Sequence, residues 1–267
     1  MHPSMLAAHI SDWIRERVSE AGARGVVLGM SGGLDSSVAA VLCKRACPDT
    51  TLGLILPCKS PPEDVTHARL IAAQFDIETE EFDLSAIFTA FLTLLTGDER
   101  HGGAAERTVE LAIANLKPRL RMICLYYFAN KRNYLVVGTG NKSELTIGYF
   151  TKYGDGAADI LPLGDVLKTE ERALAEELGI PRVIIEKPPS AGLWAGQTDE
   201  GEIGMSYELL DRILALWERG DADVSRTACD PELVARVKQM AERSRHKREP
   251  IPIFRRTTDE RGNPGHS

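Results

Sequence analysis

GMSGGLDSS, residues 29–37, is the stretch that decides the fold class, because of what lies on either side of it. It follows the apolar run GVVLGM (25–30), which predicts a buried strand, and it opens the pattern SSVAAVLCKRA (36–46), which predicts a helix. Gly32 and Gly33 let backbone N–H groups turn inward at the N-terminus of that helix, where the dipole favours an anion. We therefore predict a phosphate-binding loop.

Two common phosphate-binding patterns do not match this loop. A Walker motif needs GK[ST] after four intervening residues, and the dinucleotide fingerprint needs GxGxxG. A glycine-rich turn with a serine N-cap is the structural alternative. Asp35 inside the loop, together with the flanking strand and helix, favours the phosphate site.

The rest of the chain repeats the alternation of strand and helix. Further strands are predicted at 51–58, 78–85 and 134–140, and helices at 1–18, 61–75, 83–95, 167–179, 206–220 and 230–248. This order predicts the α/β class, with a doubly wound parallel sheet, flanking helices and a helical C-terminal part. We expect one domain over 1–267, with a mobile loop at 188–204.

Composition restricts the possible functions. The 267 residues are 43% hydrophobic and 27% charged, as in an ordinary globular protein. The apolar runs are far shorter than the roughly 20 residues that span a bilayer, and the amphipathic N-terminus does not resemble a signal peptide. The net charge of −7 disfavours a nucleic-acid partner. We expect a cytoplasmic protein with no membrane partner.

Five cysteines form an odd set, which indicates reduced thiols. Cys43 and Cys47 are four residues apart on a predicted helix and could form half of a metal site. No CxxC pair or histidine partner completes that site, so buried thiols are the preferred interpretation.

Six further blocks, in order, resemble the NAD synthetase family. The string SGGxDS alone resembles the wider superfamily of N-type ATP pyrophosphatases, whose loop grips the leaving pyrophosphate. The blocks are NLKPRLRM (115–122), GTGNKSEL (138–145), GYFTKYGDGAADILPL (148–163), LKTE (167–170), KPPSAGLWAGQTDE (187–200) and RHKREPIP (245–252). Leu34, where many members carry Gln or Val, and Pro118, which is expected to interrupt the arginine-bearing helix, depart from the family pattern.

The resemblance implies an adenine nucleotide alpha hydrolase-like fold and a set of ligand contacts. ATP, the co-substrate, would contact Gly29, Met30, Ser31, Gly32, Gly33, Leu34, Asp35, Ser36, Thr139, Lys168 and Ser190. Mg²⁺ would be held by Asp35 and Glu144, which follow the C-terminal ends of parallel strands. Deamido-NAD would contact Arg119, Lys152, Asp159, His246 and Lys247. We expect Asp155 to be the catalytic residue that positions ammonia.

Ordinary structural roles remain open for several of these residues. Glu144 suits a first-turn helix acid, and Lys168 suits a solvated lysine at a helix start. The cluster RSRHKR also suits the dipole at a helix end. Arg119 and Arg121 are two apart on a helix, so we expect one to face the ligand and the other to serve the fold.

The implied reaction joins deamido-NAD, ATP and ammonia through an acyl-adenylate and releases pyrophosphate and AMP. The family is dimeric, so we expect a homodimer. A tRNA-thiolating relative would need reactive cysteines and a basic surface, and an ATP-binding module without catalysis would need no second anion site. Because no segment here is long enough to form a glutaminase domain, we expect the enzyme to use free ammonia.

Overall fold

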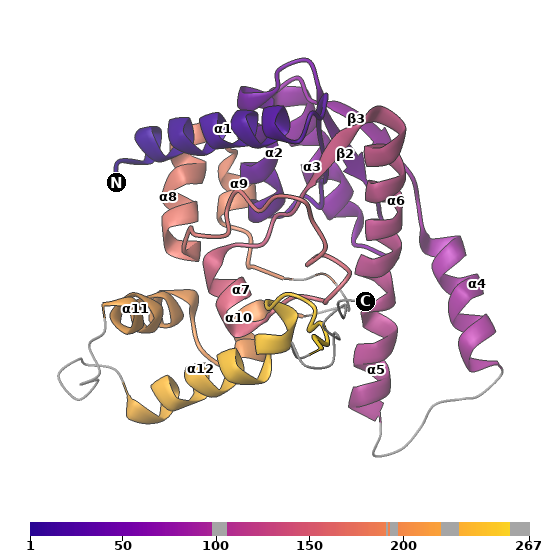
Figure 1. The fold of residues 1–267 in the computed structure, drawn as a ribbon. Coiled ribbons are helices and arrows are strands. Elements are labelled where there is room, and N and C mark those ends of the chain that lie inside the picture. Colours follow the sequence, from indigo (N-terminus) through magenta and orange to yellow (C-terminus); the bar gives the residue numbers. More distant parts are fainter. Residues whose placement is uncertain (98–105, 191, 193–196, 220–229, 257–267) are drawn as a thin grey trace, which may run out of the picture.

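A four-stranded parallel sheet forms the centre of the molecule (Figure 1). The computed structural model describes residues 1–97, 106–190, 192, 197–219 and 230–256. The strand order is β3-β2-β1-β4, and Val26 of β1 lies opposite both Thr51 and Leu135. The strands are β1 (Gly25–Gly29), β2 (Thr51–Ile55), β3 (Glu78–Glu81) and β4 (Tyr134–Val137). The predicted strands are confirmed, although β2, β3 and β4 end earlier than expected.

Helices cover both faces of the sheet, which confirms the doubly wound arrangement. Val26 and Leu28 of β1 pack into a core with helices on one face, whereas Val27, pointing the other way, packs with Phe88 and Phe128. The first face is covered by α1 (Pro3–Glu20), α2 (Leu34–Ala46), α3 (Pro62–Gln74), α8 (Lys168–Leu178) and α9 (Arg182–Ile185). The second is covered by α4 (Ser85–Thr96) and α6 (Leu116–Arg132).

The C-terminal part is helical, as predicted, and has a core of its own. Tyr207, Leu210 and Val237 are fully buried there. Its elements are α7 (Lys142–Ile147), α10 (Asp199–Ile203), α11 (Tyr207–Glu218), α12 (Pro231–Arg243) and the short 3-10 turn Arg245–Lys247. The expected loop at 188–204 therefore contains a helix, α10, capped by the Thr198 hydroxyl. Residues 191 and 193–196 lie outside the described residues.

Pro118 does not interrupt the arginine-bearing helix, contrary to the sequence expectation. It lies in the first turn of α6, where a missing N–H costs nothing. The break falls at Asn115, between α6 and α5 (Glu106–Ala114). A proline ring clashes with the carbonyl four residues earlier, and that residue is Ala114, where α5 ends.

Several of the described cysteines lie in the core, as the buried-thiol interpretation of Cys43 and Cys47 predicts. Cys43, Cys47 and Cys58 are buried free thiols, and burial raises the pKa of each. Across the described ranges, no helix combines the length and apolar character needed to cross a bilayer.

Candidate active site

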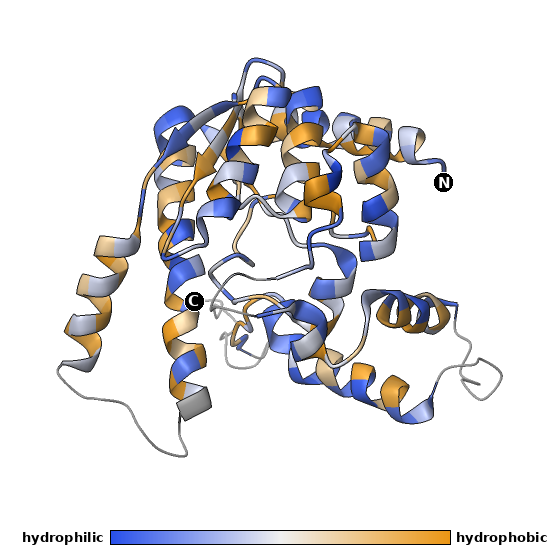
Figure 2. Cartoon of the chain, turned by 180° about the vertical axis from the view of Figure 1, so that it is seen from behind, coloured by the Kyte–Doolittle hydropathy of each residue, from blue (hydrophilic) through white to orange (hydrophobic). Residues whose placement is uncertain are grey.

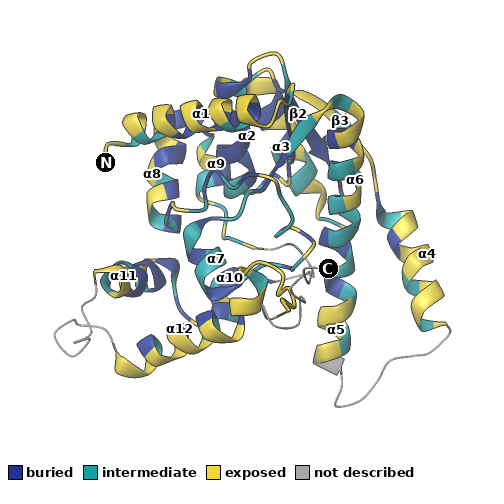
Figure 3. Cartoon of the chain, in the orientation of Figure 1, coloured by how far each residue is buried: buried dark blue, intermediate teal, exposed yellow. Residues whose placement is uncertain are grey.

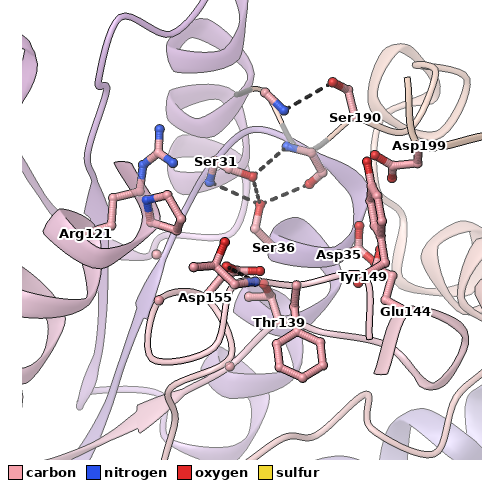
Figure 4. A pocket seen from close by; sticks show the side chains of 18 of the residues that line it. Ser31, Asp35, Ser36, Arg121, Thr139, Glu144, Tyr149, Asp155, Ser190 and Asp199 are labelled. Atoms are coloured by element: carbon pink, nitrogen blue, oxygen red, sulfur yellow. Dashed lines mark hydrogen bonds between the residues drawn. The ribbon is translucent and has the colours of Figure 1, made fainter. Parts of the chain in front are cut away.

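Hydrogen bonds within the loop between β1 and α2 fix its shape (Figure 4). The Ser31 N–H donates to Ser36 Oγ at 3.2 Å, and the Ser36 hydroxyl donates to the Gly33 carbonyl at 3.1 Å. Gly32 has φ +80°, and a Cβ there would lie 2.1 Å from the Asp64 carbonyl oxygen on α3. Only glycine fits this position. The N-cap Gly33 has no side chain to cap α2, so the first-turn N–H groups suit an anion.

A cavity of about 990 Å³ opens beside this loop at the C-terminal ends of the strands. All predicted site residues line it except Gly32 and Asp159. The predicted residues in its lining are Gly29, Met30, Ser31, Gly33, Leu34, Asp35, Ser36, Arg119, Thr139, Glu144, Lys152, Asp155, Lys168, Ser190, His246 and Lys247. Asp159 instead supports β4, where its carboxylate accepts from the Val136 N–H at 2.7 Å and from the Tyr126 hydroxyl at 3.3 Å.

Lys168 lies at the centre of a buried charge cluster. Its side chain is 1% exposed, and Nζ is 2.5 Å from Asp35 Oδ2, 3.5 Å from Glu171 Oε2 and 3.8 Å from Glu144 Oε1. Burial by itself would lower the pKa of Lys168, but these three carboxylates raise it above its usual value. Lys168 is therefore a charged, buried residue, and the solvated-lysine interpretation is wrong.

The carboxylates around Lys168 titrate differently. Burial, and after it the Asp35 charge, raises the pKa of Glu144 to about 8. Burial also raises the pKa of Glu171 well above its usual value. The same burial acts on Asp35, but Lys168 and hydrogen bonds from Glu171 and Asn141 hold its pKa below the usual range. The cluster therefore carries more acidic groups than one ammonium neutralises.

Two buried oxygen atoms near the cluster, Glu171 Oε1 and Asp199 Oδ1, have no hydrogen-bond partner among the described residues. Within the described part of the chain, no three His, Cys, Asp or Glu side chains are arranged to hold a metal ion. Asp35 and Glu144 nevertheless offer hard carboxylate oxygens, and a divalent cation that takes its remaining ligands from phosphates or water would favour the ionised form of Glu144. These residues fit Mg²⁺.

Glu144 is also a helix-start acid, as the structural alternative proposed. Asn141 caps α7, its Oδ1 accepting from the Glu144 N–H at 3.0 Å, and the two residues form a capping box. Asn141 Nδ2 donates to Asp35 Oδ1 at 2.7 Å, which links α7 to the phosphate loop. Sequence reasoning missed Asn141, although the spacing Asn-x-x-Glu in GTGNKSEL signals this cap.

Cationic side chains from distant segments meet at another part of the cavity. Arg119 of α6 donates to the Lys152 carbonyl at 3.3 Å, and Lys152 Nζ donates to the His246 carbonyl at 2.5 Å. Lys247 Nζ donates to the carbonyls of Gly148 and Phe150, each at 2.7 Å. These hydrogen bonds hold the 3-10 turn Arg245–Lys247 against the loop after α7. The cluster RSRHKR therefore makes tertiary contacts in addition to any effect on the dipole of its own helix.

Arg119 and Arg121 both line the cavity, and Arg121 in addition serves the fold. Arg121 donates from Nε to the Leu56 carbonyl at 3.0 Å and from Nη2 to Ser60 Oγ at 3.2 Å. It thus also fixes the turn after β2. Helical spacing places the two side chains at different angles around α6, but the cavity between the sheet and the 148–159 segment is concave, so both side chains line it.

Asp155 lies opposite the phosphate loop, below it in Figure 4. Its Oδ1 accepts from the Thr151 N–H at 3.0 Å, so it stabilises its own turn. Burial raises the pKa of Asp155, and the Thr151 hydrogen bonds and the Arg121 charge oppose that rise.

Comparison with known proteins identifies the family. A family model described as NAD synthase matches residues 6–251. The chain belongs to the NAD synthase family. This family member is 48% identical to an NH(3)-dependent NAD(+) synthetase from Archaeoglobus fulgidus over 96% of the chain and 98% of that relative.

Solved structures support the fold of this NAD synthase family member. It resembles an NMN synthetase from Francisella tularensis (TM-score 0.84, 33% identity, covering 95% of this chain and 99% of that one). It also resembles an NH3-dependent NAD synthetase from Campylobacter jejuni solved with a nitrate ion (TM-score 0.79, 31% identity, covering 96% and 100%). The fold expected from the family resemblance is confirmed.

Sequence reasoning also missed four polar residues near Glu144. The Tyr207 hydroxyl donates to Asp199 Oδ2 at 3.1 Å and lies 3.3 Å from Glu144 Oε1. The Tyr149 hydroxyl donates to Glu202 at 2.5 Å. These side chains come from α10, α11 and the end of α7, and no motif spacing relates such distant segments of this NAD synthase family member.

Proposed function

We propose that this chain catalyses the ATP-dependent amidation of deamido-NAD by ammonia to NAD. The substrate carboxylate attacks the α-phosphorus of ATP, and pyrophosphate leaves. Ammonia then attacks the resulting acyl-adenylate, and AMP leaves. The curated relatives named NH(3)-dependent NAD(+) synthetase support this ligase activity.

One observation carries the proposal: a single cavity holds both an anion-binding loop and a separate set of cationic side chains. Two polyanionic substrates must be held together for the first step, and their mutual repulsion has to be offset. The loop at Ser31–Ser36 suits the triphosphate, and Arg119, Lys152 and Lys247 suit a second phosphorylated substrate. An ATP-binding module without catalysis would need only the first.

Within this proposal the predicted residues keep their roles. The loop residues, Thr139, Lys168 and Ser190 bind ATP, and Lys168 acts as a point charge toward the leaving pyrophosphate. His246 joins the cationic set, and Asp159 acts on the dinucleotide through its support of β4. Asp155 positions ammonia close to the activated carboxyl group of the substrate. Because the pKa of Asp155 is raised, its own carboxylate can accept a proton from the incoming nitrogen.

Asp35 and Glu144 would hold Mg²⁺. When bound, the ion would screen the charge of the phosphates around the α-phosphorus. Lys168 and Asn141 orient the Asp35 carboxylate for this role, and the capping box orients Glu144.

The decisive experiment measures NAD, AMP and pyrophosphate from ATP, ammonium and deamido-NAD. We expect all three products in equal amounts and only with deamido-NAD present. A parallel reaction with nicotinic acid mononucleotide tests a second candidate function, which the likeness to an NMN synthetase favours. If neither deamido-NAD nor nicotinic acid mononucleotide leads to release of AMP and pyrophosphate, the proposal is refuted.

We further propose that the chain forms a homodimer through the outer face of α4, α5 and α6. The α4 ribbon is coloured largely hydrophobic in Figure 2 and largely exposed in Figure 3. Large apolar side chains of α4 and α6 are exposed: Ile87, Leu94, Leu95, Ile123 and Tyr127. A helix that is apolar on nearly all sides is normally buried, and a second copy presents the same apolar surface.

The proposal also covers location and extent. Buried free thiols support a reducing compartment such as the cytoplasm. The family match over 6–251 supports one domain spanning 1–267.

A further inference from the structure

The first residue of α8 is Lys168, and the start of this helix is capped from outside it. The preceding residue, Leu167, has an apolar side chain that offers no hydrogen-bond acceptor. The Lys168 N–H donates to Ser143 Oγ at 3.0 Å, and the Thr169 N–H donates to Asp211 Oδ2 at 2.8 Å. Two N–H groups of the α8 start are therefore satisfied by α7 and α11.

A single buried carboxylate connects these caps. The Ser143 hydroxyl donates to Asp211 Oδ1, so Asp211 binds Thr169 directly and Lys168 through Ser143. Asp211 is 4% exposed and Ser143 is fully buried. The negative charge of Asp211 faces the N-terminal ends of both α7 and α8, where the helix dipoles favour it.

The two helices that Asp211 joins carry Lys168, which contacts Asp35, and Glu144, which lies 3.8 Å from Lys168 Nζ. Glu144 directly follows Ser143 on α7, and Lys168 opens α8. We infer that Asp211 is a positioning residue for Lys168, which places the ammonium group against the phosphate loop through the Ser143 and Thr169 contacts. The inference rests on the proposed role of Lys168 in binding ATP.

Lys168 Nζ has little freedom in this arrangement. Its side chain is fully enclosed, and its Asp35 contacts of 2.5 and 2.6 Å depend on where the α8 backbone begins. A shift of about 1 Å in a group that positions a substrate can cost about a hundredfold in rate. Among the described residues, Asp211 accepts hydrogen bonds from Ser143 and Thr169, and neither of these lines the cavity, so its effect on the site is indirect.

The test compares Asp211→Ala, Asp211→Asn and a control in the same pair of helices. An asparagine can still accept from the Thr169 N–H and donate to Ser143 Oγ, so it preserves the geometry without the charge. The control is Glu208→Gln, because the half-exposed Glu208 of α11 pairs with Arg172 of α8 at 2.6 Å, and a glutamine can still accept from Arg172, which lines the cavity. The measurements are the Kd of ATP without the second substrate, KM and kcat for NAD formation, and the thermal midpoint.

We expect Asp211→Ala to raise the ATP Kd and KM by about tenfold or more and to lower kcat, with the KM of deamido-NAD unchanged. Asp211→Asn should recover most of both losses. Glu208→Gln should leave ATP binding and kcat unchanged even where it lowers the thermal midpoint. If Asp211→Ala does not fold, Ser143→Ala, which removes the link to Lys168, should give the same selective loss.

Folded Asp211→Ala with wild-type ATP affinity and kcat would overturn the inference. So would equal losses of ATP and deamido-NAD affinity that follow the thermal midpoint in all variants, because that pattern indicates a purely structural role. ATP binding needs no NAD formation. A wild-type protein that makes no NAD but binds ATP, with selective loss in Asp211→Ala, would refute the proposed function and leave the positioning role intact.

Discussion

Replacing Asp35 by asparagine tests the centre of the proposed ATP and Mg²⁺ site. Asp35 accepts from Lys168 Nζ with both oxygens, at 2.5 and 2.6 Å, and from Asn141 Nδ2 at 2.7 Å. An asparagine has the same shape but only one acceptor oxygen, and its NH₂ group would face another donor. At least one donor of Lys168 or Asn141 therefore loses its acceptor.

The cost to stability should be moderate. A hydrogen bond to a charged group is worth about 1.5–3 kcal/mol. Lys168 would keep Glu171 at 3.5 Å and Glu144 at 3.8 Å, so it would not become an isolated buried charge, whose cost is about 3–5 kcal/mol. We therefore expect Asp35→Asn to lower the free energy of unfolding by about 1.5–3 kcal/mol and to remain folded.

The cost to catalysis should be larger. Loss of one group that stabilises charge in the transition state costs about 2.7–4 kcal/mol, which corresponds to a fall in kcat of about 10²–10³. The assay is pyrophosphate release at saturating Mg²⁺ and substrates, alongside thermal unfolding. Asp165→Asn is the control, because Asp165 pairs with Lys142 at 2.8 Å but is 94% exposed, and it should leave kcat unchanged. Pyrophosphate release near the wild-type rate in Asp35→Asn would refute the assignment.

Three further predictions concern titration, assembly and the nitrogen source. The folded-state pKa of Glu144 is about 8, so the folded protein keeps a proton that the unfolded chain releases near pH 4.5. The free energy of unfolding of the ligand-free protein should therefore fall between these pH values, by up to about 1.4 kcal/mol per pH unit. Glu144→Gln should flatten that slope in urea unfolding, and an unchanged slope would contradict it. Leu94→Glu on α4 should convert the dimer to a monomer in light scattering. Val183→Glu, which changes another exposed apolar side chain but on α9, should leave the dimer intact, and a monomeric wild type would refute the proposed interface. Glutamine should not replace ammonium as the nitrogen source, because burial raises the pKa of the described thiols and none of them is an activated nucleophile. NAD formation from ammonium-free glutamine would contradict this. The KM for total ammonium should fall as the pH rises above neutrality.

Local patterns in the sequence were sufficient for the fold and for the phosphate loop. The run 25–30, the turn with Gly32 and the helix after it are neighbours in the chain, so their chemistry can be read without tertiary information. Alternation of strand and helix then determines parallel pairing and helices on both faces, because a parallel strand needs a crossover. The ordered family motifs pointed to most residues that line the cavity.

Only the tertiary structure decided how those residues act on one another. The buried state of Lys168, its three carboxylate neighbours and the Asp211 caps join residues from α2, α7, α8 and α11, which are far apart in the sequence. Neither periodicity nor motif spacing records such contacts, because a side chain's pKa and burial depend on what other elements place around it. The same reason explains why Glu144 could be recognised as an acid at a helix start, while its raised pKa could not be foreseen.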